Sequence, residues 1–246
     1  GCRKFVAVSQ LTRDIFLRQY PINPEKVCVI HPGVGLEDFT KKNQDVVRQT
    51  VRRNLGIEAD VPLFVFASMN FEIKGLDDIL GALYHVRKSN GRFKIIVAGK
   101  GNAGKYQKMA AGKGLSDSIV FTGALEKDKL IDLYLAGDAY VMLSKFDTFG
   151  MVVLEAMAAG LPVIVSGNVG AKDLVREDEN GFVIDNPSDH EKTAAKMALL
   201  LDADIRRRMS EAALQTASQN TWNQTVAKYL DLYHDLLDRK KAQSSA

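Results

Sequence analysis

Short runs of apolar residues alternate along the chain with longer stretches in which apolar residues recur every three to four positions. The short runs are rich in β-branched and aromatic residues and predict strands, whereas the longer stretches predict amphipathic helices. We expect strands at 5–8, 27–30, 63–67, 93–98, 119–121, 139–143, 163–165 and 181–184. We expect helices at 10–19, 43–55, 75–89, 106–113, 127–136, from 151 to about 160, at 171–176 and from 188 onward. Strands separated by helices of this length favour an α/β fold with a parallel, doubly wound sheet.

The segment after the predicted strand 139–143 carries two carboxylates, a glycine turn and a helix start. Asp147 precedes the turn, Gly150 lets a ligand approach the backbone closely, and Glu155 lies one helical turn beyond Met151. The free N–H groups at the start of this helix form an anion site. Because it offers hydroxyl acceptors and a phosphate cradle, the segment suits a nucleotide-sugar. An ordinary amphipathic helix that ends at Gly160 is the alternative.

The order acid, turn, glycine, helix, Gly-Leu-Pro and strand over 147–165 resembles the C-terminal half of the GT-B glycosyltransferases of family 4, the group 1 glycosyltransferases. That family marks its donor site with two Glu residues separated by seven others, whereas this chain has Asp147, seven residues and Glu155. The resemblance covers most of the chain and implies a Rossmann-like domain. It implies that Asp147 binds donor-sugar hydroxyls and Glu155 the ribose hydroxyls, as the catalytic pair. It also implies that the intervening turn faces sugar and distal phosphate through Thr148, Phe149, Gly150, Met151 and Val152, with Phe149 also packing the turn.

A second candidate site lies where the predicted strand 63–67 leads into the next helix. The family has an Arg just after this strand and a Lys before a glycine, and both contact the pyrophosphate. Lys74-Gly75 matches the second element, but Ser68 or Met69 stands where the Arg is expected. Lys145 and Lys100 are candidate substitutes for that Arg. The alternative for Lys74 is a solvated residue at a helix start.

The run Gly99-Lys100-Gly101-Asn102-Ala103-Gly104 is a literal GxGxxG that follows the predicted strand 93–98. Alone it would suggest a dinucleotide-binding dehydrogenase, but no acid ends the next strand. The group 1 family also has a glycine-rich turn here, so we expect Gly99 and Lys100 to lie near the nucleotide. The resemblance further implies that the backbone from Gly123 to Leu125 meets the base.

Residues 1–31 do not read as the beginning of a domain. They resemble the last strand and helix of the family's N-terminal Rossmann domain, followed by a linker in which His31 is expected to serve the turn rather than catalysis. We therefore expect a remnant of that domain with the linker at 1–31, and the donor-binding domain at 32–220. A C-terminal helix and tail that cross back to the N-terminal domain follow at 221–246. Because the family builds its acceptor site on the missing part, we expect this fragment alone to be inactive in transfer.

An apolar stripe with helical spacing marks the C-terminal segment: Trp222, Val226, Tyr229, Leu230, Tyr233, Leu236 and Leu237. We expect these side chains to pack in a core, and an exposed stripe would promote self-association. The basic run 239–241 could touch anionic lipid, which makes peripheral membrane contact a minor hypothesis.

Composition narrows the functional classes. A net charge of only +3 does not favour nucleic acid as a partner, and no apolar run reaches the length of a membrane helix. The start of the chain lacks the features of a signal peptide, and Cys2 and Cys28 form no CxxC pair, which indicates a reduced, cytoplasmic protein. The four histidines are scattered, and there is no Walker lysine or nucleophile elbow. We expect no metal and no cofactor, with Lys74 and the helix N-terminus supplying positive charge.

The resemblance implies a retaining hexosyltransferase that uses a nucleoside diphosphate sugar and a glycan or lipid-linked acceptor. Residues 70–75 and the Lys100 loop look most like lipopolysaccharide-core glucosyltransferases, which favours a UDP-sugar. We expect a cytoplasmic enzyme, with the inner face of the membrane as a secondary site. The alternatives are a GT-B-type epimerase or phosphorylase, and a non-catalytic nucleotide-binding module favoured by the missing Arg and the Asp147 substitution.

Overall fold

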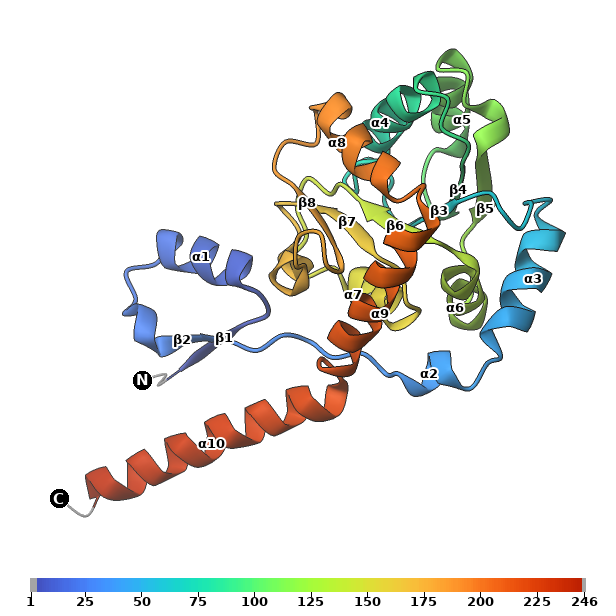
Figure 1. The fold of residues 1–246 in the computed structure, drawn as a ribbon. Coiled ribbons are helices and arrows are strands. Elements are labelled where there is room, and N and C mark those ends of the chain that lie inside the picture. Colours follow the sequence, from blue (N-terminus) through green and yellow to red (C-terminus); the bar gives the residue numbers. More distant parts are fainter. Residues whose placement is uncertain (1–3, 245–246) are drawn as a thin grey trace.

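A six-stranded parallel sheet forms the centre of the computed structural model, which describes residues 4–244 (Figure 1). The strands run in the order β5-β4-β3-β6-β7-β8. All neighbouring strands in this sheet pair in parallel, so the expected doubly wound α/β fold is confirmed. The strand bounds are β3 (Leu63–Ser68), β4 (Lys94–Gly99), β5 (Ile119–Gly123), β6 (Ala139–Met142), β7 (Val163–Ser166) and β8 (Gly181–Ile184).

Helices cover both faces of this sheet because its strands are apolar on both sides. In β3, Leu63 and Val65 belong to one core cluster, while Phe64 and Phe66 belong to the other. The first core contains residues of α6 (Lys127–Ala136), α7 (Met151–Ala158) and α9 (Ala203–Ser218), and α3 (Gln44–Asn54) packs outside α6. The second core contains residues of α4 (Leu76–Lys88), α5 (Ala103–Gly112) and α8 (His190–Leu199).

The direction in which successive strands are added to the sheet reverses between β3 and β6. From β3 the chain proceeds outward through β4 to β5, whereas from β6 it proceeds in the other direction through β7 to β8. The loops after β3 and β6 therefore diverge at the carboxyl ends of these two neighbours, which is where open α/β sheets bind ligands.

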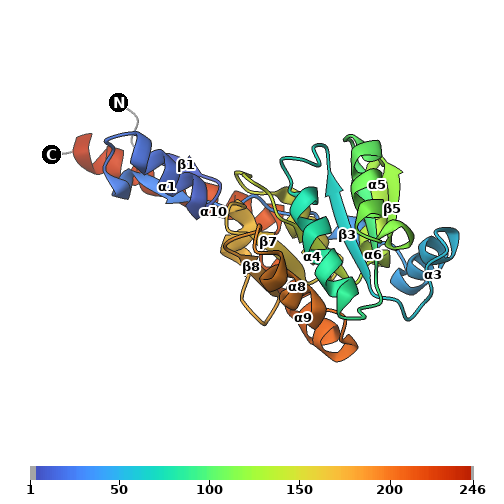
Figure 2. The ribbon, with the colours of Figure 1, turned by 90° about the horizontal axis from the view of Figure 1, so that it is seen from above.

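The N-terminal residues form a unit outside this sheet. Strands β1 (Phe5–Ala7) and β2 (Val27–Val29) pair in parallel with each other, and α1 (Gln10–Gln19) and the 3-10 turn η1 (Pro24–Lys26) connect them. This unit and the long helix α10 (Trp222–Ser244) extend from the same side of the main domain (Figures 1 and 2). The linker meets the start of α10, where Val34 N–H donates to the Asn220 carbonyl at 3.0 Å. The assignment of 1–31 to another domain stays a prediction.

Several expected elements differ in detail. The short helix α2 (Glu37–Thr40) was not expected, and α5 begins at Ala103 because the Asn102 side chain caps it. Residues 171–176 were expected to be helical, but a 3-10 turn, η3 (Gly170–Leu174), forms there, and a second such turn, η2 (Ser116–Ser118), precedes β5. The helical region after residue 188 divides into α8, α9 and α10.

The expectation that the C-terminal stripe packs in a core is wrong for five of its seven residues. Their exposed fractions lie between 49% and 55%, and the residues are Trp222, Val226, Leu230, Tyr233 and Leu237. Tyr229 and Leu236, at the edge of the same stripe, are half-buried. An apolar helical face is therefore exposed along α10.

Two further expectations concern membranes and thiols. No helix within residues 4–244 combines the length and apolar character needed to cross a membrane. Cys28 is a free thiol, whereas Cys2 lies outside the described residues, as do the last two residues of the C-terminal tail.

Candidate functional site

Two helices at the switch point begin at a glycine in the left-handed region. Gly75 is the N-cap of α4 with φ of 76°, and Gly150 is the N-cap of α7 with φ of 89°. A Cβ on Gly75 would lie 2.0 Å from the carbonyl oxygen of Leu143, so this loop packs directly on the end of β6. No side chain caps α7, and its first N–H groups are therefore available to an anion.

Lys74 and Asp147 meet across the switch point. The Lys74 Nζ lies 2.5 Å from Asp147 Oδ2, and both side chains are about one-fifth exposed, at 22% and 17%. The other carboxylate oxygen, Oδ1, accepts the backbone N–H of Phe149 at 3.2 Å. The structure thus brings together the residues that we expected to bind phosphate and sugar. The short Asp side chain folds back onto its own turn in the way that is typical of Asx turns.

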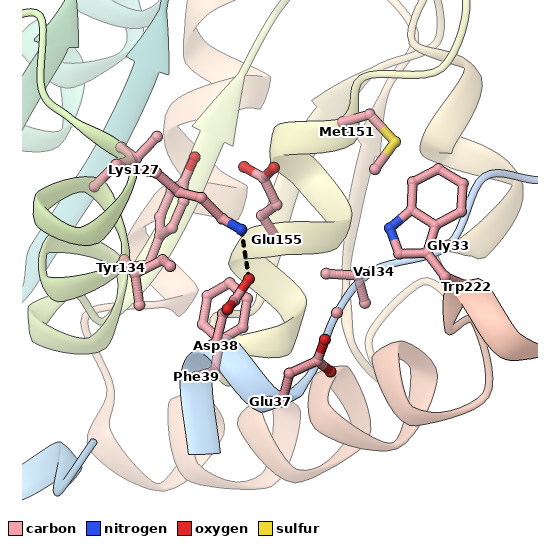
Figure 3. Close-up of a pocket in the computed structure, with 13 residues that line it drawn as sticks. Gly33, Val34, Glu37, Asp38, Phe39, Lys127, Tyr134, Met151, Glu155 and Trp222 are labelled. Atoms are coloured by element: carbon pink, nitrogen blue, oxygen red, sulfur yellow. Dashed lines mark hydrogen bonds and ion pairs between the residues drawn. The ribbon is translucent and has the colours of Figure 1, made fainter. Parts of the chain in front are cut away.

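Glu155 lines a cavity of about 320 Å³ between α2, α6, α7 and the start of α10 (Figure 3). Met151 lines the same cavity one helical turn earlier, as the spacing predicted. Burial raises the pKa of the Glu155 carboxyl above its ordinary value, although the ammonium group of Lys127 acts in the opposite direction. Lys127 also forms an ion pair with Asp38 of α2, with 2.6 Å between Nζ and Oδ2.

The hydroxyl of Tyr134 is buried beside Glu155. Its proximity lowers the pKa of Glu155 slightly, yet within the described chain the hydroxyl has no hydrogen-bond partner at normal distance. A buried hydroxyl without a partner is costly, and a polar ligand in this cavity could supply one. Three further residues line this cavity that were not expected from the sequence: Tyr134, Lys127 and Asp38. The helix pattern could have placed Tyr134 and Lys127 on α6, but nothing in the sequence connected them with Glu155.

The two candidate substitutes for the family's Arg lie in different places. The backbone N–H of Lys145 donates to the Ile73 carbonyl at 2.8 Å, so Lys145 lies beside the Lys74 loop. Lys100 is exposed and lines another hollow with Asn70 and Tyr106, apart from the cavity of Glu155.

The GxGxxG run has a structural explanation in close packing. A Cβ on Gly99 would lie 1.7 Å from the Ser68 carbonyl oxygen, and one on Gly101 would lie 2.3 Å from the ring of Phe71. The Asn102 side chain accepts the N–H of Lys105 at 3.0 Å and thereby caps α5. Because this helix start is already capped while that of α7 is not, phosphate binding is favoured at α7.

The remaining predicted residues divide between surface and core. Gly123 ends β5 with φ of 73°, and Leu125 is half-buried beside a hollow between α3 and α6. Neither residue lines the cavity of Glu155. Thr148 is exposed, and Val152 packs against the core. The side chain of Phe149 is only 3% exposed, so it packs the turn as expected and only its backbone could face a ligand.

Metal-ligating residues do not converge anywhere in the described part of the chain. Within residues 4–244 no group of three or more His, Cys, Asp or Glu side chains could hold a metal ion. His31 instead contacts Asp173, with 3.0 Å between Nε2 and Oδ2, and His190 contacts Asp78 at the same distance.

The doubly wound parallel sheet, with an uncapped helix start at its switch point, defines a Rossmann-like type of domain. The chain belongs to the family of glycosyl transferases group 1, whose model matches residues 47–216. It is 29% identical over 246 residues to a D-inositol 3-phosphate glycosyltransferase of Streptomyces bingchenggensis (strain BCW-1). The alignment covers 95% of this chain and 53% of that protein. The protein of the same name from Corynebacterium glutamicum (strain R) is 29% identical over 229 residues, covering 90% of this chain and 54% of its own length. The chain thus spans about half the length of these relatives.

Solved structures share the fold. WaaG, described as a glycosyltransferase involved in lipopolysaccharide biosynthesis, superposes with a TM-score of 0.80 at 22% identity, over 93% of this chain and 62% of that one. Anabaena Alr3699/HepE in complex with UDP and glucose gives a TM-score of 0.78 at 23% identity, over 93% and 63% of the two chains. A glycosyltransferase from Rickettsia africae ESF-5 gives 0.82 at 23% identity, over 96% and 64%. The expected family and the GT-B type of domain are therefore confirmed.

Proposed function

We propose that this chain is the donor-binding half of a glycosyltransferase that takes a hexose from a UDP-sugar with retention at the anomeric carbon. One observation carries the proposal. Lys74, Asp147 and the uncapped start of α7 meet at the switch point, and the same helix presents Glu155 in a cavity. A nucleotide-sugar offers hydroxyls on both sides of its phosphates, which suits this arrangement.

The proposed mechanism assigns one task to each group. The carboxylate of Glu155 accepts hydrogen bonds from the two ribose hydroxyls, and the N–H groups of Gly150 to Val152 bind the distal phosphate. Lys74 turns from Asp147 toward the pyrophosphate, which frees Asp147 to accept hydroxyls of the sugar. The bond from the anomeric carbon to the phosphate oxygen breaks as the acceptor oxygen bonds to that carbon, and the acceptor hydroxyl passes its proton to the leaving diphosphate. The ammonium and the helix N-terminus stabilise the negative charge on that diphosphate.

The choice of UDP and of the acceptor rests on similarity. Alr3699/HepE was solved with UDP, with UDP-glucose, and with UDP and glucose. The acceptor proposed from the sequence is a glycan or a lipid-linked glycan, handled in the cytoplasm or at the inner face of its membrane. The names of the sequence relatives favour a second candidate acceptor, a phosphorylated polyol such as D-inositol 3-phosphate.

Calorimetric titration with UDP, GDP and ADP tests the donor assignment on the parent chain and on Glu155→Ala. We expect UDP to bind the parent, and the variant to bind it roughly ten- to a hundredfold more weakly, since a charged hydrogen-bond partner contributes about 1.5–3 kcal/mol. Glu191→Ala is the matched control, because Glu191 is an exposed carboxylate on α8 whose side chain is 81% exposed.

The outcomes separate the candidates. Tighter binding of GDP or ADP would overturn UDP as the donor nucleotide, and equal binding by both variants would overturn the role of Glu155. A whole protein that binds a nucleotide-sugar but never transfers or hydrolyses it would identify a non-catalytic module, the alternative favoured by Ser68 and Met69 at the place of the family's Arg.

A further inference from the structure

Ser9, a buried serine of the N-terminal unit, contacts the donor turn, by which we mean residues 147–150. Ser9 lies between β1 and α1 and is fully buried, with 0% of its surface exposed. Its Oγ donates a hydrogen bond to the carbonyl oxygen of Thr148 at 2.7 Å, although 139 positions separate the two residues. The helix that starts at this serine thus begins on the turn between Asp147 and Gly150.

The surrounding hydrogen bonds determine where the Ser9 proton points. Thr12 N–H donates to Ser9 Oγ at 3.1 Å, and the Thr12 hydroxyl donates to the Ser9 carbonyl at 2.9 Å. The Ser9 N–H in turn donates to Thr12 Oγ1 at 3.1 Å, which completes a capping box. Thr12 Oγ1 also lies 3.1 Å from Ser9 Oγ, but the Thr148 carbonyl is the closer acceptor, at 2.7 Å, and takes the Ser9 proton.

Three consecutive carbonyl groups of the donor turn are fixed by hydrogen bonds. The Asp147 carbonyl accepts the N–H of Gly170 at 3.0 Å, and the Phe149 carbonyl accepts the N–H of Ala171 at 2.7 Å. Both of those bonds come from η3, within the main domain. The bond to the Thr148 carbonyl is the one that the N-terminal unit supplies.

The packing at this point leaves no room for rearrangement. A Cβ on Gly170 would lie 2.1 Å from the Thr148 carbonyl oxygen and 2.6 Å from Ser9 Oγ. Beside it, Asp173 Oδ2 accepts the backbone N–H of Gln10 at 2.6 Å and lies 3.0 Å from His31 Nε2. Burial acts to raise the pKa of Asp173, but the bonds from His31 and Gln10 outweigh it and lower that pKa overall.

We propose that Ser9 is a positioning residue for the donor site. The Thr148 carbonyl and the Phe149 N–H belong to one planar peptide group, so a hydrogen bond at one end orients the other. That N–H donates to the carboxylate of Asp147. Ser9 therefore orients Asp147 and the N–H groups after it, and it couples the position of the N-terminal unit to sugar-nucleotide binding. The inference rests on the proposed function of Asp147 and the α7 helix start.

Ser9→Ala tests the inference in titrations with UDP-glucose and with uridine. Uridine reaches Glu155 but not the donor turn, so its affinity should stay unchanged, while UDP-glucose should bind about fivefold more weakly through one disturbed hydrogen bond. Thr12→Val is the matched control, because it breaks the capping box and leaves the bond from Ser9 to Thr148 in place. An equal loss in both variants, or an equal loss of both ligands, would overturn the proposal.

Amide hydrogen exchange gives a readout that needs no ligand. We expect faster exchange at the Phe149 amide in Ser9→Ala and the parent rate in Thr12→Val. If the parent chain binds no nucleotide, the proposed function fails on its own, and the exchange experiment still decides the role of Ser9. Unchanged exchange at Phe149 in Ser9→Ala would overturn that role.

Discussion

Glu155 is a carboxylate held where the protein environment disfavours its charge. Burial raises its pKa, and Lys127 and Tyr134 offset this only in part. The positive charge of Lys127 acts on two carboxylates, because Lys127 also pairs with Asp38 across the same cavity (Figure 3). An ionised group that is unfavourable in the folded state and yet retained at a cavity is typical of functional sites.

Replacing Glu155 with Gln should therefore stabilise the protein at neutral pH. Since the folded-state pKa is raised, the folded protein binds the proton more tightly than the unfolded chain does. The protonated carboxyl of Glu155 makes its full contribution to the free energy of unfolding below its ordinary pKa of 4.5. That contribution is lost as the pH rises through the pKa of the folded state. Glu155→Gln should raise the melting temperature at pH 7, and this gain should shrink below pH 4.5. Thermal unfolding across this pH range measures both effects.

The control for this prediction is Glu191→Gln on the exposed surface of α8. It should leave the melting temperature close to that of the parent at every pH. A parent-like or lower melting temperature for Glu155→Gln at pH 7 would contradict the idea that its charge is held at a cost.

At the scale of elements, the site depends on how two helices begin. Helices α4 and α7 each start at a left-handed glycine, and β3 and β6, the strands that lead to them, are neighbours in the sheet. The close approach of Gly75 to the Leu143 carbonyl brings the two loops together, which places Lys74 beside Asp147. Backbone packing therefore positions this ion pair.

Gly75→Ala should lower the free energy of unfolding by at least about 2 kcal/mol, because the methyl group would be strained at positive φ and would overlap the Leu143 carbonyl. Gly112→Ala is the matched control, since a Cβ there meets nothing within 4 Å at the end of α5. That control should be neutral or stabilising by up to about 1 kcal/mol. Urea unfolding of both variants measures the difference, and a Gly75→Ala chain as stable as the control would contradict the packing argument.

At the scale of the whole molecule, one apolar surface lacks a cover. Helix α10 projects away from the sheet (Figures 1 and 2), and its exposed apolar face runs from Trp222 to Leu237. The start of α10 is anchored near the linker, where the Thr225 hydroxyl donates to the His31 carbonyl at 3.0 Å. Contiguous exposed apolar surfaces of this kind promote association.

We predict that this chain self-associates through α10. Sedimentation velocity should show a mass that rises with concentration, and the double substitution Val226→Glu, Leu230→Glu should return the chain to a monomer. Lys228→Glu adds acidic charge at an exposed position off the stripe and should leave association unchanged. A parent chain that is monomeric across the concentration range, or one whose association survives the double substitution, would show that α10 does not drive it.

The local pattern was sufficient for the eight strands and for most helices, because the period of apolar residues is a property of each segment. The pattern failed where a segment is too short to show a period, and where the period does not reveal which other element packs on the apolar face. The four residues of α2 are too few to show a period. The stripe on α10 indicated an apolar face, but no local signal says whether another element covers it.

The candidate site divides in the same way. The sequence by itself determined that Asp147, Gly150 and Glu155 lie on one turn and the helix that follows it, because the apolar period and the glycine belong to one short segment. Only the tertiary structure decided that Lys74 pairs with Asp147 and that Ser9 holds the Thr148 carbonyl. These pairs are 73 and 139 positions apart, and the order of the strands and the packing of glycines bring them into contact.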